Sequence, residues 1–182
     1  MFLLCVMTAA GQQTDTLRIY DPNTATSTGY NSTAYPKQLA RFDLPKPAYI
    51  KGFVVKLYGN TGSSVKLRMF GHEGGQIFAD LQSDLIDPIT LTKTTDDVED
   101  VYAELDSPGV YLANNQFFLM FEGFKDGLRV VTDRTDHPIS CQSSSGGTYY
   151  YEFLYSGTQG QWYLASNDNR AFAVDVILEY PL

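Results

Sequence analysis

Hydrophobic and polar residues alternate with a period of two along most of the chain. In residues 50–58, Phe53, Val55 and Leu57 share one face of an extended segment. The same alternation returns in residues 171–180, near the end of the sequence. Because successive side chains of a strand point to opposite faces, this pattern predicts half-buried β-strands. No stretch shows a helical period beyond about two turns.

Turn-forming residues separate the predicted strands at short intervals, as in residues 59–62 and 106–109. Residues 116–121 are apolar on both faces, which is typical of a central strand covered on both sides. Many short strands with such turns are typical of a two-sheet sandwich or a barrel. The segments differ in length and hydrophobicity, as the central and edge strands of two sheets do. We therefore predict an all-β fold, a two-sheet antiparallel β-sandwich with jelly-roll topology.

The chain has 182 residues, which suits one domain at roughly 100–200 residues per domain. Its first ten residues are mostly apolar and end in small residues, as in an export signal; a buried first strand is the alternative. We expect residues 1–13 to be a signal peptide with a short leader and residues 14–182 to be a single β-sandwich domain. No later stretch approaches the roughly 20 apolar residues of a membrane span. The expected location is therefore secreted or at the cell surface, extracellular or periplasmic, without a membrane span.

Composition and charge exclude several classes of protein. Thirteen Tyr and eleven Phe, with only 19% charged residues, exclude a disordered chain and a coiled coil. The formal net charge of −8 argues against nucleic acid as the main partner. A domain of this size can bury roughly 70% of the surface that its unfolded chain exposes, so its stability requires no cofactor.

Residues that could carry catalysis are few. The two histidines, His72 and His137, match no zinc-binding spacing. Cys141 lies four residues from His137, which is roughly 13 Å in an extended strand and too far for a Cys–His nucleophile. Glu104 and Asp106 could form an acid and base pair, but carboxylates on one strand face are usually solvated. We therefore expect no enzymatic activity.

The order of segments in the second half of the chain points to a class of protein. The segments are a strand at 98–105, a Ser-Pro-Gly turn, an apolar strand at 114–121, and further stretches at 128–133, 162–163 and 171–176. This order resembles the jelly-roll β-sandwich accessory modules of secreted bacterial proteins, including carbohydrate-binding modules and cleaved-adhesin domains. The resemblance spans roughly residues 39–180. It implies attachment to a surface, substrate targeting or support of a neighbouring domain.

Aromatic residues concentrate in residues 149–163. In an extended strand, Phe153 shares one face with three tyrosines of this segment. If that face is exposed, sugar rings could stack on it; if it belongs to the core, Phe153 lies in the interior. The predicted ligand-binding site consists of Tyr149, Tyr151, Tyr155, Trp162 and Tyr163.

Acidic residues offer candidate oxygen ligands for calcium. Four of them lie in residues 96–100, and Asp133 and Asp136 follow further along the chain. Ca²⁺ takes about six to eight oxygen ligands in flexible geometry, and a structural Ca²⁺ is common in modules of the class that the chain resembles. The alternative is a set of solvated loops, because no calcium-loop motif is present. The candidate metal ligands are therefore Asp133 and Asp136.

These observations predict a secreted, non-catalytic binding or adhesion module whose expected ligand is a carbohydrate. The alternative is a cell-surface structural or assembly protein that binds protein partners. A β-sandwich glycoside hydrolase is a third hypothesis, and it requires facing carboxylates about 5–10 Å apart in a groove. The expected partner is thus a polysaccharide or a surface protein, and not a nucleic acid.

Overall fold

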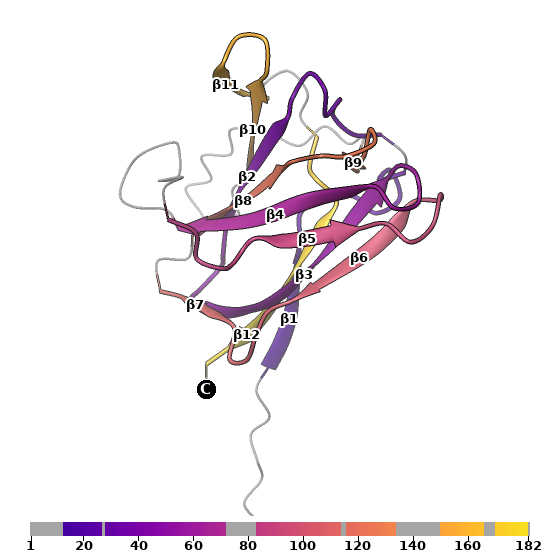
Figure 1. The fold of residues 1–182 in the computed structure, drawn as a ribbon. Coiled ribbons are helices and arrows are strands. Elements are labelled where there is room, and N and C mark those ends of the chain that lie inside the picture. Colours follow the sequence, from indigo (N-terminus) through magenta and orange to yellow (C-terminus); the bar gives the residue numbers. More distant parts are fainter. Residues whose placement is uncertain are drawn as a thin grey trace, which may run out of the picture.

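The structure is a computed structural model, and its described part consists of strands, turns and loops without a helix (Figure 1). The described residues are 13–26, 28–71, 83–113, 116–133, 150–165 and 170–181. The all-β class predicted from the alternating pattern is therefore confirmed. In this described part of the chain, no helix has the length and apolar character needed to cross a membrane.

One sheet, which we call sheet A, contains six described strands paired antiparallel. They are β1 (Gln13–Arg18), β3 (Ala48–Tyr58), β6 (Glu99–Glu104), β7 (Val110–Leu112), β9 (Arg129–Val130) and β12 (Val174–Tyr180). The order across the sheet is β1-β12-β3-β6, while β7 and β9 pair with opposite ends of β3. The long β3 is therefore the strand on which sheet A is built.

The second sheet, sheet B, also contains six described antiparallel strands. In their order across the sheet, they are β11 (Gln161–Leu164), β10 (Tyr150–Ser156), β2 (Lys37–Asp43), β8 (Gln116–Glu122), β4 (Ser64–Gly71) and β5 (Ile89–Thr92). The first four strands of the chain fall alternately in sheets A and B. The predicted two-sheet antiparallel sandwich is confirmed, and its finer description as a jelly roll stays a prediction.

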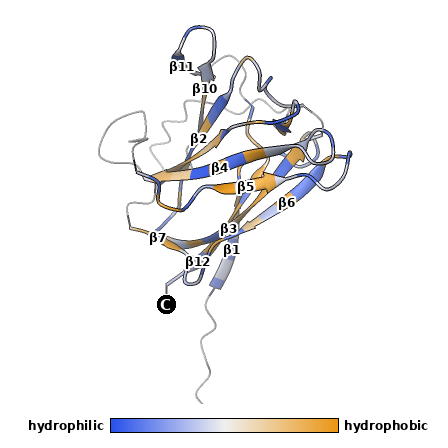
Figure 2. Cartoon of the chain, in the orientation of Figure 1, coloured by the Kyte–Doolittle hydropathy of each residue, from blue (hydrophilic) through white to orange (hydrophobic). Residues whose placement is uncertain are grey.

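The inner faces of the two sheets meet in one hydrophobic core, and Figure 2 shows hydrophobic stretches on strands of both sheets. Phe53, Val55 and Leu57 of β3, predicted to share a face, are all fully buried there. Across from them in sheet B, Phe42 stacks on Phe117 with ring centroids 5.1 Å apart. Full burial of side chains of this size contributes about 2–3 kcal/mol each, so this core is the main source of stability.

Sheet B is apolar on its outer face as well. A second cluster of buried side chains lies there: Leu39, Phe70, Phe118, Met120 and Phe153. None of them is more than 1% exposed. Strand β8 contributes alternate residues to the main core and to this cluster, which confirms that residues 116–121 form a central strand covered on both sides.

Candidate functional site

The predicted aromatic site falls mainly on the hairpin of β10 and β11, at the edge of sheet B and the top of Figure 1. Tyr155 and Trp162 lie directly opposite each other in this hairpin, with ring centroids 5.4 Å apart and planes at 65°. The Lys37 ammonium lies 5.6 Å from the Tyr155 ring centroid. The two rings therefore meet edge to face, and they form a corner instead of a flat platform.

Of the other predicted aromatic residues, the structure places the side chain of Tyr163 alone. Tyr163 pairs with Leu154, so it faces the opposite side of the hairpin from Tyr155. The backbone of Tyr151 lies opposite Arg41 in β2. Tyr149 lies outside the described residues. Among the predicted ligand residues whose side chains are described, Tyr155 and Trp162 lie together and Tyr163 lies apart from them.

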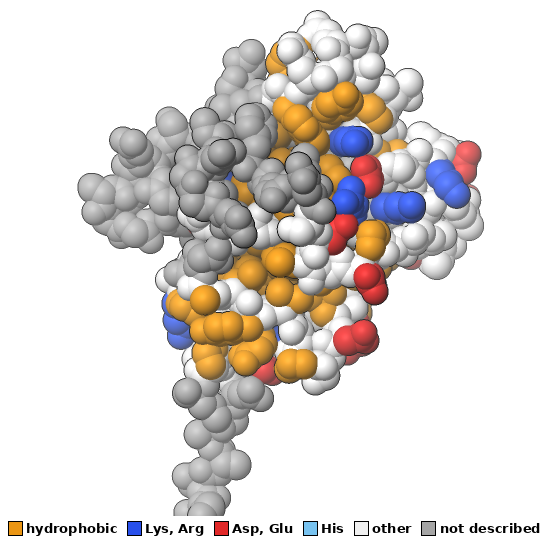
Figure 3. All heavy atoms as spheres, turned by 60° about the vertical axis from the view of Figure 1, so that its left-hand side comes forward, with side chains coloured by type: hydrophobic (Ala, Val, Ile, Leu, Met, Phe, Trp, Pro, Cys, Tyr) orange, Lys and Arg blue, Asp and Glu red, His pale blue; other side chains and the backbone are white. Residues whose placement is uncertain are grey.

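Packing accounts for much of this aromatic segment. Trp162 packs against the second cluster, and Phe153 within that cluster is 1% exposed. In the space-filling view, one group of hydrophobic side chains lies near the top of the molecule, at the height of the hairpin (Figure 3). Charged side chains of both signs lie beside it. Phe153 and Trp162 therefore take part in the packing of the outer face of sheet B, as the core interpretation predicted for Phe153.

The candidate calcium ligand Asp133 is fully buried and bound to the backbone. One carboxylate oxygen accepts a hydrogen bond from the Asp21 backbone N–H at 2.8 Å, and the other from the Ala171 backbone N–H at 2.9 Å. Asp136 lies outside the described residues, as do His72, His137 and Cys141. Among the residues that the structure describes, no three His, Cys, Asp or Glu side chains are grouped as metal ligands. Both carboxylate oxygens of Asp133 therefore hold backbone N–H groups of segments that are distant in sequence.

The carboxylates considered for hydrolysis lie in a small hollow beside β6. Glu104 and Asp106 line a space of about 250 Å³ together with Asp87, which comes from the segment before β5. All three side chains belong to exposed residues. The described residues that line this hollow include no aromatic ring and no side-chain hydrogen-bond donor with which to hold a substrate.

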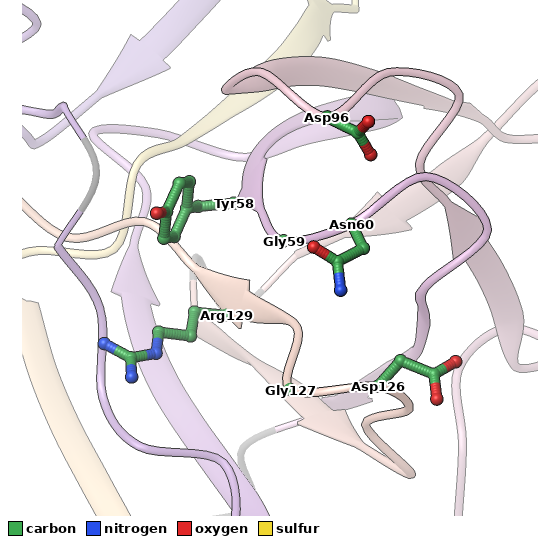
Figure 4. A pocket seen from close by; sticks show the side chains of 7 residues that line it. All are labelled: Tyr58, Gly59, Asn60, Asp96, Asp126, Gly127 and Arg129. Atoms are coloured by element: carbon green, nitrogen blue, oxygen red, sulfur yellow. The ribbon is translucent and has the colours of Figure 1, made fainter.

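A larger hollow of about 450 Å³ lies at the end of the sandwich where three turns meet (Figure 4). We call it the loop-end pocket, and its lining residues are Tyr58, Gly59, Asn60, Asp96, Asp126, Gly127 and Arg129. Figure 4 shows Tyr58 and Arg129 on one side, Asp96 and Asp126 on the other, and the Asn60 amide between them. The pocket therefore combines one aromatic ring with hydrogen-bond donors and acceptors.

The β3–β4 turn supplies one wall of the pocket. Gly59 and Gly62 adopt positive φ values of 155° and 84°, a region that favours glycine. A Cβ atom on Gly59 would lie 3.1 Å from both the Leu128 and the Ser63 side chains. The Ser63 N–H donates to the Asn60 carbonyl at 3.1 Å and closes the turn. This sequence therefore fixes Asn60 as the first residue of a tight turn.

The connection between β8 and β9 supplies a second wall. Asp126 and Gly127 both have positive φ, 56° and 72°, and the Leu128 N–H donates to the Lys125 carbonyl at 3.2 Å. Two central residues with positive φ define a type I′ turn, for which Asp-Gly is a favoured pair. The chain then enters β9, where Arg129 lies directly opposite Tyr58. The ring and the guanidinium are thus placed side by side by strand pairing.

The loop between β5 and β6 forms the third wall and is tied to the first. The Asp96 carboxylate accepts hydrogen bonds from the Thr61 backbone N–H at 2.6 Å and from its hydroxyl at 2.8 Å. These bonds lower the pKa of Asp96 below its ordinary value, so this side chain stays ionised at neutral pH. The loop itself is held by Glu99, which accepts hydrogen bonds from Thr94 and lies 3.6 Å from the buried Lys93 ammonium.

Glu99 makes this loop sensitive to acid. Hydrogen bonds from the Thr94 hydroxyl and backbone N–H lower the pKa of Glu99 from 4.5 to about 2. A carboxyl group with a lowered pKa stabilises the folded state above its unfolded pKa, and that stabilisation is lost as the pH falls. We expect the loop to lose stability between pH 4.5 and about 2. Thermal melting at stepped pH should show it, and Glu99→Gln should remove part of this pH dependence. An unchanged pH profile in Glu99→Gln would contradict this role.

Sequence patterns alone do not single out the loop-end pocket. They assign residues 59–62 to a turn and mark the acidic residues of 96–100 as candidate calcium ligands, without a link between the two segments. The available signal is an aromatic residue, Tyr58, that ends a strand immediately before a Gly-Asn turn. The turn after Tyr58 becomes one wall of a pocket because Asp96 and Asp126, which are distant in sequence, line the same hollow.

No protein-family model and no curated protein matches the chain. The class of this protein is therefore described by its fold and its pocket alone. It is a two-sheet antiparallel β-sandwich with a polar pocket, bordered by one aromatic ring, at one end of the sheets.

Proposed function

We propose that the protein is a secreted, non-catalytic module that binds carbohydrate through the loop-end pocket. The observation that carries the proposal is the Tyr58 ring, 39% exposed, beside a hollow lined by amide, carboxylate and guanidinium groups. The apolar face of a sugar ring can stack on an aromatic side chain, while its hydroxyls bond to polar groups of this kind. This combination fits a neutral polyhydroxylated ligand better than an apolar or a strongly charged one.

The size and rigidity of the pocket support the same ligand class. Its volume of about 450 Å³ lies within the range of about 300–1,000 Å³ that is typical of small-molecule sites. The Asn60 and Asp126 side chains both stand on turns closed by backbone hydrogen bonds. Because these turns are already ordered, binding has little loop entropy to overcome.

The protonation state of the pocket supports binding without catalysis. A glycosidase acid must hold a proton near neutral pH, which requires a raised pKa. Asp96 has a lowered pKa, because Thr61 donates two hydrogen bonds to its carboxylate. An ionised carboxylate is suited to accept hydrogen bonds from sugar hydroxyls. A role outside the cell is consistent with the apolar segment at residues 1–10, which resembles an export signal.

Substitution of Tyr58 tests the proposal. We expect Tyr58→Ala and Asn60→Ala to weaken binding of the best neutral sugar at least about tenfold, because each removes a direct contact with the ligand. Binding is measured by calorimetry against a panel of neutral monosaccharides and short oligosaccharides. Tyr163→Ala, which removes a similarly exposed tyrosine from the hairpin, is the matched control and should bind as the original chain does.

Two outcomes would contradict this proposal. If no sugar of the panel binds, and the chain instead retains a surface protein, the assembly hypothesis replaces carbohydrate binding. If a sugar binds and its affinity falls in Trp162→Ala but not in Tyr58→Ala, the site lies at the hairpin corner and not at the loop-end pocket.

A further inference from the structure

The outer face of sheet A carries a row of exposed tyrosines. Tyr111, Tyr102 and Tyr58 are 47%, 52% and 39% exposed, and they rank among the most exposed large hydrophobic side chains of the described residues. The strand register places all three away from the core. Tyr58 follows Leu57, which is buried on the inner face, while Tyr102 pairs with half-buried Val54. We call these three residues the tyrosine row.

The pairing of β3 with its neighbouring strands shows how the tyrosine row runs across sheet A. Tyr49 of β3 pairs with Tyr111 on one side and with Glu179 of β12 on the other. Val54 likewise pairs with Tyr102 on one side and with β12 on the other. Both β7 and β6 therefore follow the same edge of β3. The row runs parallel to β3 from Tyr49 to Tyr58, a length of about 30 Å at the rise of an extended strand.

Gly52 leaves room for one of these rings close to the sheet. A Cβ atom at Gly52 would lie 3.3 Å from both the Cε2 and the hydroxyl oxygen of Tyr102. The Tyr102 ring therefore covers the position that a side chain would occupy. At the end of the row, Tyr111 packs on Tyr49 with ring centroids 5.0 Å apart and planes at 45°. The rings are thus held by their neighbours, which lowers the entropy lost when a ligand stacks on them.

Charges of both signs lie on this face, and two pairs of them are in contact. Lys56 lies 2.6 Å from Asp100, and Lys51 lies 3.7 Å from Glu179. Such pairs leave little local field to attract an ionic polymer. The net charge of −8 would in addition repel a polyanion. The face is therefore suited to an uncharged ligand that presents hydroxyl groups to the tyrosines and to the paired charges.

We infer that the tyrosine row binds one extended chain of a neutral polysaccharide, with one of its sugar units in the loop-end pocket. This inference rests on the proposed function, because Tyr58 belongs both to the row and to the pocket. Ion pairs lie between the tyrosine rings along β3. The rings therefore do not form the contiguous apolar patch that is found at the core of a protein interface. An extended glycan needs no such patch, since its sugar rings stack at intervals and its hydroxyls meet the polar groups between them.

Ligand length distinguishes this inference from the proposed function. The probes are neutral glucans, xylans and mannans, each as monosaccharide, short oligosaccharide and polymer. We expect Tyr102→Ala and Tyr111→Ala to leave monosaccharide affinity unchanged and to weaken polymer binding about tenfold. Tyr102→Phe, which keeps the ring, should retain most polymer binding. Tyr163→Ala is the control, and unchanged melting temperatures show that the variants are folded.

The possible results separate the two proposals. If monosaccharides bind in a Tyr58-dependent manner, but polymers bind the Tyr102 and Tyr111 variants as tightly as the original chain, the tyrosine row is overturned and the pocket stands. If neither form of any glycan binds, both proposals fail. If the chain self-associates and Tyr102→Ala abolishes this association without an effect on glycan binding, the face is a protein interface and the inference is wrong.

Discussion

Asp133→Ala should destabilise the protein by about 3–4 kcal/mol, although it removes no part of the proposed binding surface. The carboxylate is fully buried and accepts hydrogen bonds from the backbone N–H groups of Asp21 and Ala171. Hydrogen bonds to a charged group contribute about 1.5–3 kcal/mol each, and alanine would leave a buried donor at Ala171 and a partly buried one at Asp21 without this partner. For a domain of this size, a loss of that magnitude lowers the melting temperature by roughly 10 °C.

Asp133 ties together segments that are far apart in the sequence. Its own N–H donates to the Ala171 carbonyl at 3.0 Å, so residues 133 and 171 are joined in both directions. Asp133→Asn keeps one acceptor oxygen and should lose about half as much stability. Asp97→Ala removes an equal charge from an exposed residue and should change stability by less than about 0.5 kcal/mol. A melting temperature that rises with added Ca²⁺, and no longer does so in Asp133→Asn, would instead make Asp133 a metal ligand.

The sequence predicts the layers of this fold well because the signal for them is local. The alternation places Phe53, Leu67, Phe172 and Val176 inside, and none of these is more than 1% exposed. Each prediction needs only the neighbours along one strand, since a period of two decides which face a residue occupies. The same reasoning identifies residues 116–121 as a central strand, and both of its faces are buried.

The site is harder to predict because it depends on which strands become neighbours. Asn60, Asp96 and Asp126 meet only because β3, β6 and β9 lie side by side in one sheet. Nothing local links them. In the aromatic segment, the alternation shows which residues share a face of the strand. Whether that face is exposed depends on the rest of sheet B, which the local pattern does not reveal. Phe153 lies in an aromatic run that could face solvent, and sheet B buries it against Phe118 and its neighbours.

Phe172→Ala is the other substitution with a large expected effect, a loss of about 3–5 kcal/mol. Phe172 is 1% exposed and lies where the chain enters β12. Its ring meets the edge of Tyr30 at a centroid distance of 5.7 Å and the tilted ring of Phe121 at 5.6 Å. Because Phe121 belongs to sheet B, this ring joins the two sheets and the loop that carries Tyr30.

The loss of stability in Phe172→Ala has two parts, and a second variant separates them. Alanine loses the burial of the ring and leaves a cavity between the sheets, whereas Phe172→Leu keeps most of the volume and should lose about 1–2 kcal/mol. Unfolding by urea measures both values, and an unchanged slope with denaturant indicates that the folded and unfolded states keep their compactness. Tyr163→Ala, an aromatic truncation at an exposed position, should fall within about 0.5 kcal/mol of the original chain. If Phe172→Ala changed stability as little as Tyr163→Ala does, the Phe172 ring would not lie between the sheets. Sheets A and B would then pack through other residues.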